Sequence, residues 1–208
     1  MEDILEVYRR PYDPEEPMIC MDEITKQLTK EIRRTIPAEP GIPARYDYEY
    51  ERNGVCNLFM FYEPFGGKRY VSITDHRGKV DWALQIKELL DNQYPRARKV
   101  VLVMDNLNTH TGASLYETFP PHEARRLLER LEIHYTPKHG SWLNIAEIEL
   151  RVLLVQCLNR RIPDKQTLKK EVNHWQNQRN SRQAKVDWRF STDNARIKLK
   201  RLYPTLLT

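Results

Sequence analysis

The sequence predicts a mixed α/β domain organised around a five-stranded sheet, and two observations lead to this prediction. Between residues 46 and 74, side chains alternate in polarity along short segments separated by Gly-containing turns, which is the pattern of antiparallel strands. After residue 80, segments with helical spacing alternate with apolar, strand-like segments, as in α/β folds. The length of 208 residues suits one domain with a buried core.

The first half of the chain is expected to form a linker, one strand and a meander. Residues 1–17 carry three prolines among charged residues, so we expect no regular structure there and interpret them as a linker. The first strand is expected at 18–23, and later turns are expected at the Asn-Gly pair 53–54 and at 64–68. The strand segments of the meander are predicted at 46–51, 55–62 and 69–74. The Gly-Gly-Lys sequence lacks the spacing of a phosphate-binding loop, so no nucleotide cofactor is expected.

The second half is expected to alternate helices and strands. Its elements are predicted as helices at 81–90, 123–131, 141–158 and 165–179 and strands at 99–105 and 132–136. With the first strand central in the sheet and the fourth beside it, the ends of both strands meet at one edge. We therefore divide the chain into a linker (1–17), an α/β core (18–160) and a basic, helical C-terminal extension (161–208).

Composition restricts the class of protein. Hydrophobic residues make up 40% of the chain, mean hydropathy is -0.73, and no apolar segment approaches the roughly 18 residues of a membrane span. The N-terminus is acidic where a secretory signal would be basic, so a cytoplasmic protein is expected. Cys20, Cys56 and Cys157 lack disulfide or zinc-site spacing and are expected to be reduced, buried thiols.

Charge is distributed unevenly along the chain. Residues 1–150 hold 20 Lys and Arg against 25 Asp and Glu, a net charge of -5, whereas residues 151–208 hold 14 against 4, a net charge of +10. A basic segment of this kind is the electrostatic footprint of nucleic-acid binding, although a solvated helix face gives the same count.

Carboxylates stand at the ends of two predicted strands and near the start of a predicted helix. Asp22 and Asp105 each follow an apolar run, and Glu147 lies early in the helix that begins at 141. Acids on separate elements can hold two divalent ions, the arrangement used for phosphoryl transfer. Glu23 and Glu149 are the neighbouring alternatives to Asp22 and Glu147.

Three ordered segments resemble the catalytic domain of DDE transposases, and more narrowly the bacterial insertion-sequence branch of the mariner-like superfamily. They are residues 20–23 (CMDE), 104–110 (MDNLNTH) and 135–147 (YTPKHGSWLNIAE). The resemblance runs from about Asp3 to Pro204. It implies an RNase H-like fold and two Mg²⁺ ions, for which Mn²⁺ can substitute. It also implies cleavage and strand transfer of transposon DNA ends, with a TA dinucleotide as target.

By this resemblance Asp22, Asp105 and Glu147 are the catalytic and metal-binding acids. The family pattern places an Asn three residues before the third acid, which selects Glu147 over Glu149, and residues two apart on a helix cannot face one site. Neighbours on a strand point to opposite faces, and the family pattern selects Asp22 over Glu23.

Other residues are candidates for supporting roles. Asn106, His110, Trp142 and Asn144 are expected either to position substrate and water or to cap turns and pack, and the sequence leaves both interpretations open. DNA contacts are expected from Lys138, His139, Lys169, Lys170, Lys198, Lys200 and Arg201. Association with the nucleoid would follow from DNA binding. A homodimer is compatible with the sequence, which does not fix the oligomeric state.

Full-length members of the resembled family carry N-terminal helix-turn-helix modules that read the transposon ends. This sequence begins at what resembles the linker after them, so the module is expected to be absent. An active DDE enzyme is the first hypothesis. The alternatives are a catalytically idle, truncated remnant that binds DNA or full-length transposase, and a general RNase H-like nuclease or junction resolvase.

Overall fold

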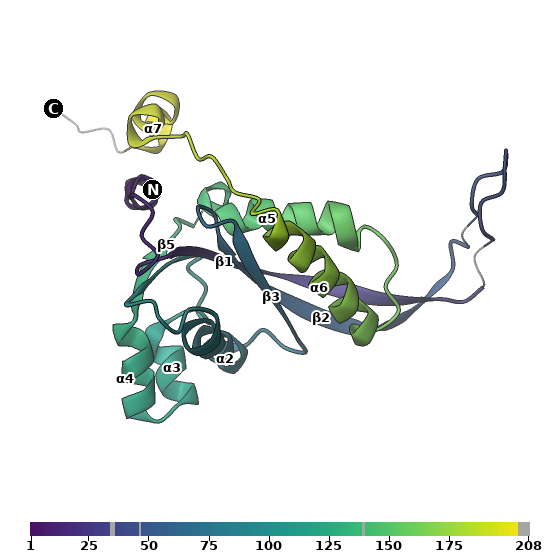
Figure 1. Ribbon diagram of the computed structural model, residues 1–208, viewed down its shortest axis with the longest axis horizontal. Coiled ribbons are helices and arrows are strands. Elements are labelled where there is room, and N and C mark those ends of the chain that lie inside the picture. Colours follow the sequence, from purple (N-terminus) through teal and green to yellow (C-terminus); the bar gives the residue numbers. More distant parts are fainter. Residues whose placement is uncertain (34–35, 46, 139, 204–208) are drawn as a thin grey trace.

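The computed structural model describes residues 1–33, 36–45, 47–138 and 140–203, and it contains a five-stranded sheet in the order β3-β2-β1-β4-β5 (Figure 1). The strands are β1 (Met18–Glu31), β2 (Tyr50–Glu63), β3 (Lys68–Thr74), β4 (Val100–Met104) and β5 (Leu131–Tyr135). Strands β1, β2 and β3 pair antiparallel, whereas β4 pairs parallel with both β1 and β5. The predicted mixed sheet, with the first strand central and the fourth beside it, is confirmed.

Helices cover both faces of this sheet (Figure 1). They are α1 (Glu2–Val7), α2 (Lys79–Glu88), α3 (Gly112–Thr118), α4 (Pro121–Glu129), α5 (Ile145–Leu153), α6 (Lys165–Ser181) and α7 (Thr192–Lys198). Short π-helical turns at Leu89–Gln93 and Leu154–Leu158 extend α2 and α5, and 3₁₀ turns form at Ser141–Leu143 and Lys200–Leu202. Helix α3 was not predicted from the sequence. The α6 helix begins as expected, because the side chain of Asp164 accepts a hydrogen bond from the backbone N–H of Thr167 at 2.7 Å.

The alternation of side chains along β1 divides the core into two clusters. Ile19 and Met21 pack with α2, α3 and α4, whereas Cys20 packs with α5 and α6 on the opposite face. The next residues continue this alternation, which directs Asp22 toward the α5 side and Glu23 toward the α2 side.

The expectation that residues 1–17 lack regular structure is wrong at the N-terminus. Helix α1 precedes the first proline of this segment, and Ile4, Leu5, Val7 and Tyr8 are buried in the cluster shared with α5. Apolar side chains at helical spacing therefore determine the structure here, since the prolines act only after residue 10. Part of the predicted linker belongs to the folded core.

The predicted turn at 53–54 is also wrong. Strand β2 runs through these residues, so the strands predicted at 46–51 and 55–62 form one strand from Tyr50, with residue 46 outside the described residues. Its pairing with β1 shifts register between Gln27 and Thr29, opposite Gly54, whose φ of 85° fits a β-bulge. β1 likewise continues to Glu31, and the two strands extend beyond the sheet as an arm (Figure 1).

The remaining sequence expectations on composition can be compared directly with the structure. All three cysteines are free and buried, as predicted. Among the described residues, no helix has the length and apolar character needed to cross a bilayer.

Near the C-terminus, α7 returns to lie beside α1 (Figure 1). Arg196 of α7 makes two hydrogen bonds of 2.8 Å to the Glu2 carboxylate of α1.

Candidate metal centre

The three predicted acids come from elements that meet at one end of the sheet. Asp22 lies in β1, beside the parallel strand β4, and Asp105 directly follows β4. Glu147 lies in the first turn of α5, which packs on β1. Asp22 and Glu147 line the same groove, of about 780 Å³, together with Trp142 and the exposed face of α5.

The electrostatics of Asp22 reflect this concentration of acids. Burial raises the pKa of the Asp22 carboxyl, and the charges of Asp105, Glu23 and Glu147 raise it further, to about 7. A hydrogen bond from the Glu23 backbone N–H to Asp22 Oδ1, at 2.8 Å, opposes the shift without cancelling it.

The chemistry of these donors fits a divalent cation. Carboxylate oxygens are the ligands that Mg²⁺ and Mn²⁺ prefer, and a cation would offset the mutual repulsion that raises the pKa of Asp22. Asp22, Asp105 and Glu147 are the residues that would hold it. A tighter group of donor atoms, all within 4.8 Å of one another, is formed by Glu23, Asp105 and His110.

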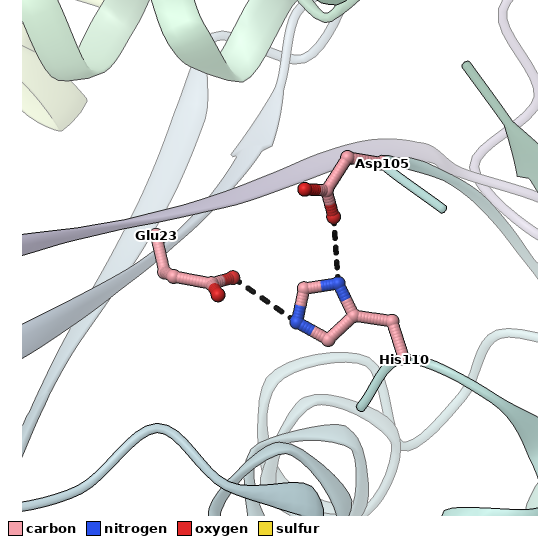
Figure 2. Close-up of side chains that lie close together, drawn as sticks. All are labelled: Glu23, Asp105 and His110. Atoms are coloured by element: carbon pink, nitrogen blue, oxygen red, sulfur yellow. Dashed lines mark hydrogen bonds and ion pairs between the residues drawn. The ribbon is translucent and has the colours of Figure 1, made fainter. Parts of the chain in front are cut away.

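His110 bridges two acids, Glu23 of β1 and Asp105 after β4, as Figure 2 shows. Its Nδ1 lies 2.7 Å from Asp105 Oδ1, and its Nε2 lies 3.1 Å from Glu23 Oε2. Burial alone would lower the pKa of His110, but its hydrogen bonds to Asp105 and Glu23 and their charges raise the pKa to about 9. In the metal-free protein this shift favours an imidazolium that compensates both carboxylates.

Further contacts hold the His110 side chain and its backbone in place. The side chain is fully buried and stacks on Trp82, with 5.9 Å between ring centroids. The Tyr135 hydroxyl donates to the His110 carbonyl oxygen at 2.8 Å, which fixes the backbone as well. His110 is therefore held in a position from which its ring orients the Asp105 carboxylate. In the sequence, Glu23 is a candidate only as the alternative to Asp22. No local pattern indicates its pairing with His110, which lies 87 residues later in the chain.

Asn144 links the third acid to the first. Its Nδ2 donates to the carbonyl oxygen of Met21 at 2.8 Å, and its Oδ1 accepts from the backbone N–H of Ala146 at 3.1 Å. One buried side chain thus caps the helix of Glu147 and ties it to the residue before Asp22.

The structure also separates Glu147 from Glu149. Glu147 is exposed at the groove, whereas Glu149 is only 2% exposed and binds two arginines. Its Oε1 lies 2.8 Å from Arg69 Nε and 2.6 Å from Arg179 Nε. These contacts clamp α5 to β3 and α6, so Glu149 holds the helix that presents Glu147.

The other predicted site residues lie in different parts of the structure. Trp142 is 40% exposed in the groove and packs edge-on against Phe190, with 5.6 Å between ring centroids. Asn106 is exposed after β4, and no contact of its side chain is described. The predicted DNA-binding residues that are exposed are Lys138, Lys169, Lys170, Lys198, Lys200 and Arg201, and His139 lies outside the described residues.

The structure partly explains the charge asymmetry of the sequence. Several basic residues after position 150 neutralise acids of residues 1–150, in the pairs Arg161–Glu31, Lys165–Asp75, Arg179–Glu149 and Arg196–Glu2. The basic residues of α7 lie apart from those in the first turns of α6, because α7 lies beside α1 (Figure 1).

Comparison with known proteins bears on the family and the fold of this chain. The sequence model of the family described as DDE superfamily endonuclease matches residues 17–169. The fold is similar to that of the Mos1 mariner paired-end complex with Mn, with a TM-score of 0.59, 16% identity, and coverage of 88% of this chain and 55% of that chain. The Mos1 strand transfer complex gives a TM-score of 0.60 with the same identity and coverage.

These likenesses confirm the predicted RNase H-like fold. The chain spans little more than half the length of the Mos1 chains, at 55% for both complexes. Among curated proteins, none matches the sequence significantly. Because the family match covers most of the chain, including all three predicted acids, the chain belongs to the DDE superfamily endonucleases.

Proposed function

We propose that this chain is the catalytic domain of a DDE transposase that cleaves and joins the DNA ends of an insertion sequence. The observation that carries the proposal is the placement of Asp22 and Glu147 in one groove, with Asp105 directly after β4, the strand beside that of Asp22. Carboxylates gathered in this way favour a divalent cation, and they lie within the region that matches DDE superfamily endonucleases.

In this proposal Asp22, Asp105 and Glu147 hold two Mg²⁺ ions, for which Mn²⁺ can substitute. Such a metal pair, when bound, activates the attacking water or 3′-hydroxyl and stabilises the leaving oxygen. The protein's own contribution is to hold the carboxylates in place. His110 orients Asp105, Asn144 ties α5 to β1, and the Glu149 clamp fixes α5.

DNA is the proposed partner. The Mos1 structures are paired-end and strand transfer complexes, one of them with a left transposon end. In this chain Lys138, Lys169, Lys170, Lys198, Lys200 and Arg201 are exposed and available to phosphates. Pairing of two copies, a TA target and association with the nucleoid are further parts of the proposal.

Plasmid nicking with Mg²⁺ or Mn²⁺ tests the function. The parent protein should nick DNA and join a 3′-hydroxyl oligonucleotide to plasmid, and EDTA should stop both reactions. Glu147→Gln should lower the nicking rate by at least ~100-fold, because it removes a metal-binding charge and keeps the shape of the side chain.

Glu129→Gln is the matched control, since Glu129 is an exposed helical acid paired with Arg125. It should nick DNA as the parent does. If Glu147→Gln retained the parent rate, the assignment of the third acid would be wrong. A parent that neither bound Mn²⁺ nor nicked DNA would instead support the catalytically idle remnant.

A further inference from the structure

The hydroxyl of Tyr8 bridges the two elements that carry the first and third acids. Tyr8 follows α1 and is 4% exposed. Its Oη donates to the carbonyl oxygen of Leu143 at 2.5 Å and lies 3.5 Å from Cys20 Sγ. Burial and the contact with Cys20 raise the pKa of Tyr8 well above its usual value, so the hydroxyl keeps its proton and remains a donor.

Both contacts lie directly beside the candidate metal centre. Cys20 is in β1, two residues before Asp22, and Leu143 is four residues before Glu147. The bond from Asn144 to the Met21 carbonyl runs between the same two segments. Two buried hydrogen-bonded links therefore join β1 to the start of α5, and the one through Tyr8 depends on a segment remote in sequence.

The C-terminal segment covers this link. The Trp188 ring packs edge-on against the Tyr8 ring, with centroids 5.1 Å apart, and the Trp188 indole N–H donates to the Phe190 carbonyl oxygen at 2.9 Å. Phe190 in turn packs on Trp142, just before Leu143. Residues 188–190 thus hold Tyr8 on one side and the segment leading to Glu147 on the other.

We propose that Tyr8 is a positioning residue, which fixes the start of α5, and with it Glu147, relative to β1 and Asp22. This inference rests on the proposed function, in which Asp22 and Glu147 share a metal site. The carboxylate positions must match the metal closely, because ligand supports that touch no metal still influence affinity and rate. The N-terminal helix and residues 188–190 thereby contribute to the geometry of the centre.

Tyr8→Phe tests the inference, since it removes the hydroxyl and keeps the ring that packs on Trp188. We expect Mn²⁺ binding, measured by calorimetry, to weaken by about 10-fold, and the nicking rate to fall by a similar factor. Amide hydrogen exchange should become faster in residues 141–147 and stay unchanged in α4 (Pro121–Glu129). Tyr116→Phe is the matched control because Tyr116 is exposed in α3, and it should match the parent in every measurement.

The readouts separate this inference from the proposed function. Unchanged Mn²⁺ affinity and unchanged exchange in Tyr8→Phe would overturn the inference even if the parent nicks DNA. Faster exchange throughout the chain, α4 included, would show a general structural role and would also overturn it. If the parent lacks nuclease activity, the exchange measurement still decides whether Tyr8 holds residues 141–147. If Tyr8→Phe does not fold, Trp188→Leu should give the same local increase in exchange, and no local increase would reject the proposal.

Discussion

Asn144 donates a hydrogen bond of 2.8 Å to the carbonyl oxygen of Met21 and so joins the helix of one candidate acid to the strand of another. The same side chain caps α5 through the Ala146 N–H. Neither partner is exposed, so no water replaces these bonds if the amide is removed. The relative positions of Asp22 and Glu147 therefore depend on a residue that itself needs no contact with metal or DNA.

Replacing Asn144 by Ala should lower the free energy of unfolding by about 2 to 3 kcal/mol, the sum of a lost helix cap and a buried carbonyl left without a donor. Urea denaturation measures this loss. Asp164→Ala is the control, because it removes the cap of α6 and should cost about 1 kcal/mol. Equal losses in both variants would mean that the bond to Met21 contributes no stability.

Glu147 and Glu149 should respond in opposite ways to the same substitution. Glu149→Gln leaves Arg69 and Arg179 buried or half-buried without their counter-ion, so it should lower stability by about 3 kcal/mol. Glu147→Gln should change stability in EDTA by less than about 0.5 kcal/mol, since the side chain is exposed, yet reduce nicking strongly. Urea denaturation and plasmid nicking of both variants distinguish them, and a reversed pattern would show that Glu149 is the third acid.

Much of the fold followed from local patterns in the sequence. The apolar run of β4, the helical spacing of α2 and the Asp164 cap of α6 each act over a few residues, so they could be recognised without tertiary structure. The arm could not, because a Gly in an Asn-Gly pair favours a turn but also fits a bulge. The pairing of β2 with a longer β1 decides that Gly54 forms a bulge and not a turn.

Asp22 and Asp105 were predicted from their positions at strand ends and Glu147 from its place early in a helix, and the resemblance to DDE transposases selected them over their neighbours. The residues that support these acids were not predicted. Tyr8 and Leu143 lie 135 residues apart, and Glu149 meets its arginines through β3 and α6. Such contacts depend on how the helices pack on the sheet. The spacing of apolar residues within one helix or strand does not show this packing. The same limit applies to the basic segment after residue 150. Some of its residues, such as Arg196 beside Glu2, pair with acids of the same chain, and the sequence alone does not show these pairs.

Glu23 and His110 should be energetically coupled. His110→Ala leaves the Glu23 carboxylate, 4% exposed, without its cationic partner, so stability should fall by about 3 to 5 kcal/mol. Adding Glu23→Gln removes the uncompensated charge, so the double variant should lose at least 1 kcal/mol less than the sum of the single losses. The exposed pair Lys79 and Glu117 provides the control cycle, with a coupling below about 0.5 kcal/mol. Additive losses for Glu23 and His110 would contradict the bridge.

Metal removal should make the stability of the protein depend on pH through Asp22. In the folded, metal-free protein, burial and the charges of Asp105, Glu23 and Glu147 raise the pKa of Asp22 to about 7, whereas the unfolded chain ionises near the ordinary value of 3.8. The folded state therefore holds a proton that the unfolded state has released between these values, so stability should fall as pH rises from about 4 to about 7, by at most about 4 kcal/mol.

Asp22→Asn abolishes this titration, so in EDTA the variant should become more stable than the parent as pH rises from about 5 to about 8. Mg²⁺ at neutral pH should stabilise the parent and have little effect on the variant, because binding to the folded state alone raises its stability. Thermal midpoints with EDTA or Mg²⁺ measure both effects. Asp193→Asn is the control, since Asp193 is exposed on α7 and should follow the parent. A constant difference between the parent and Asp22→Asn across this pH range would show that folding does not raise the pKa of Asp22.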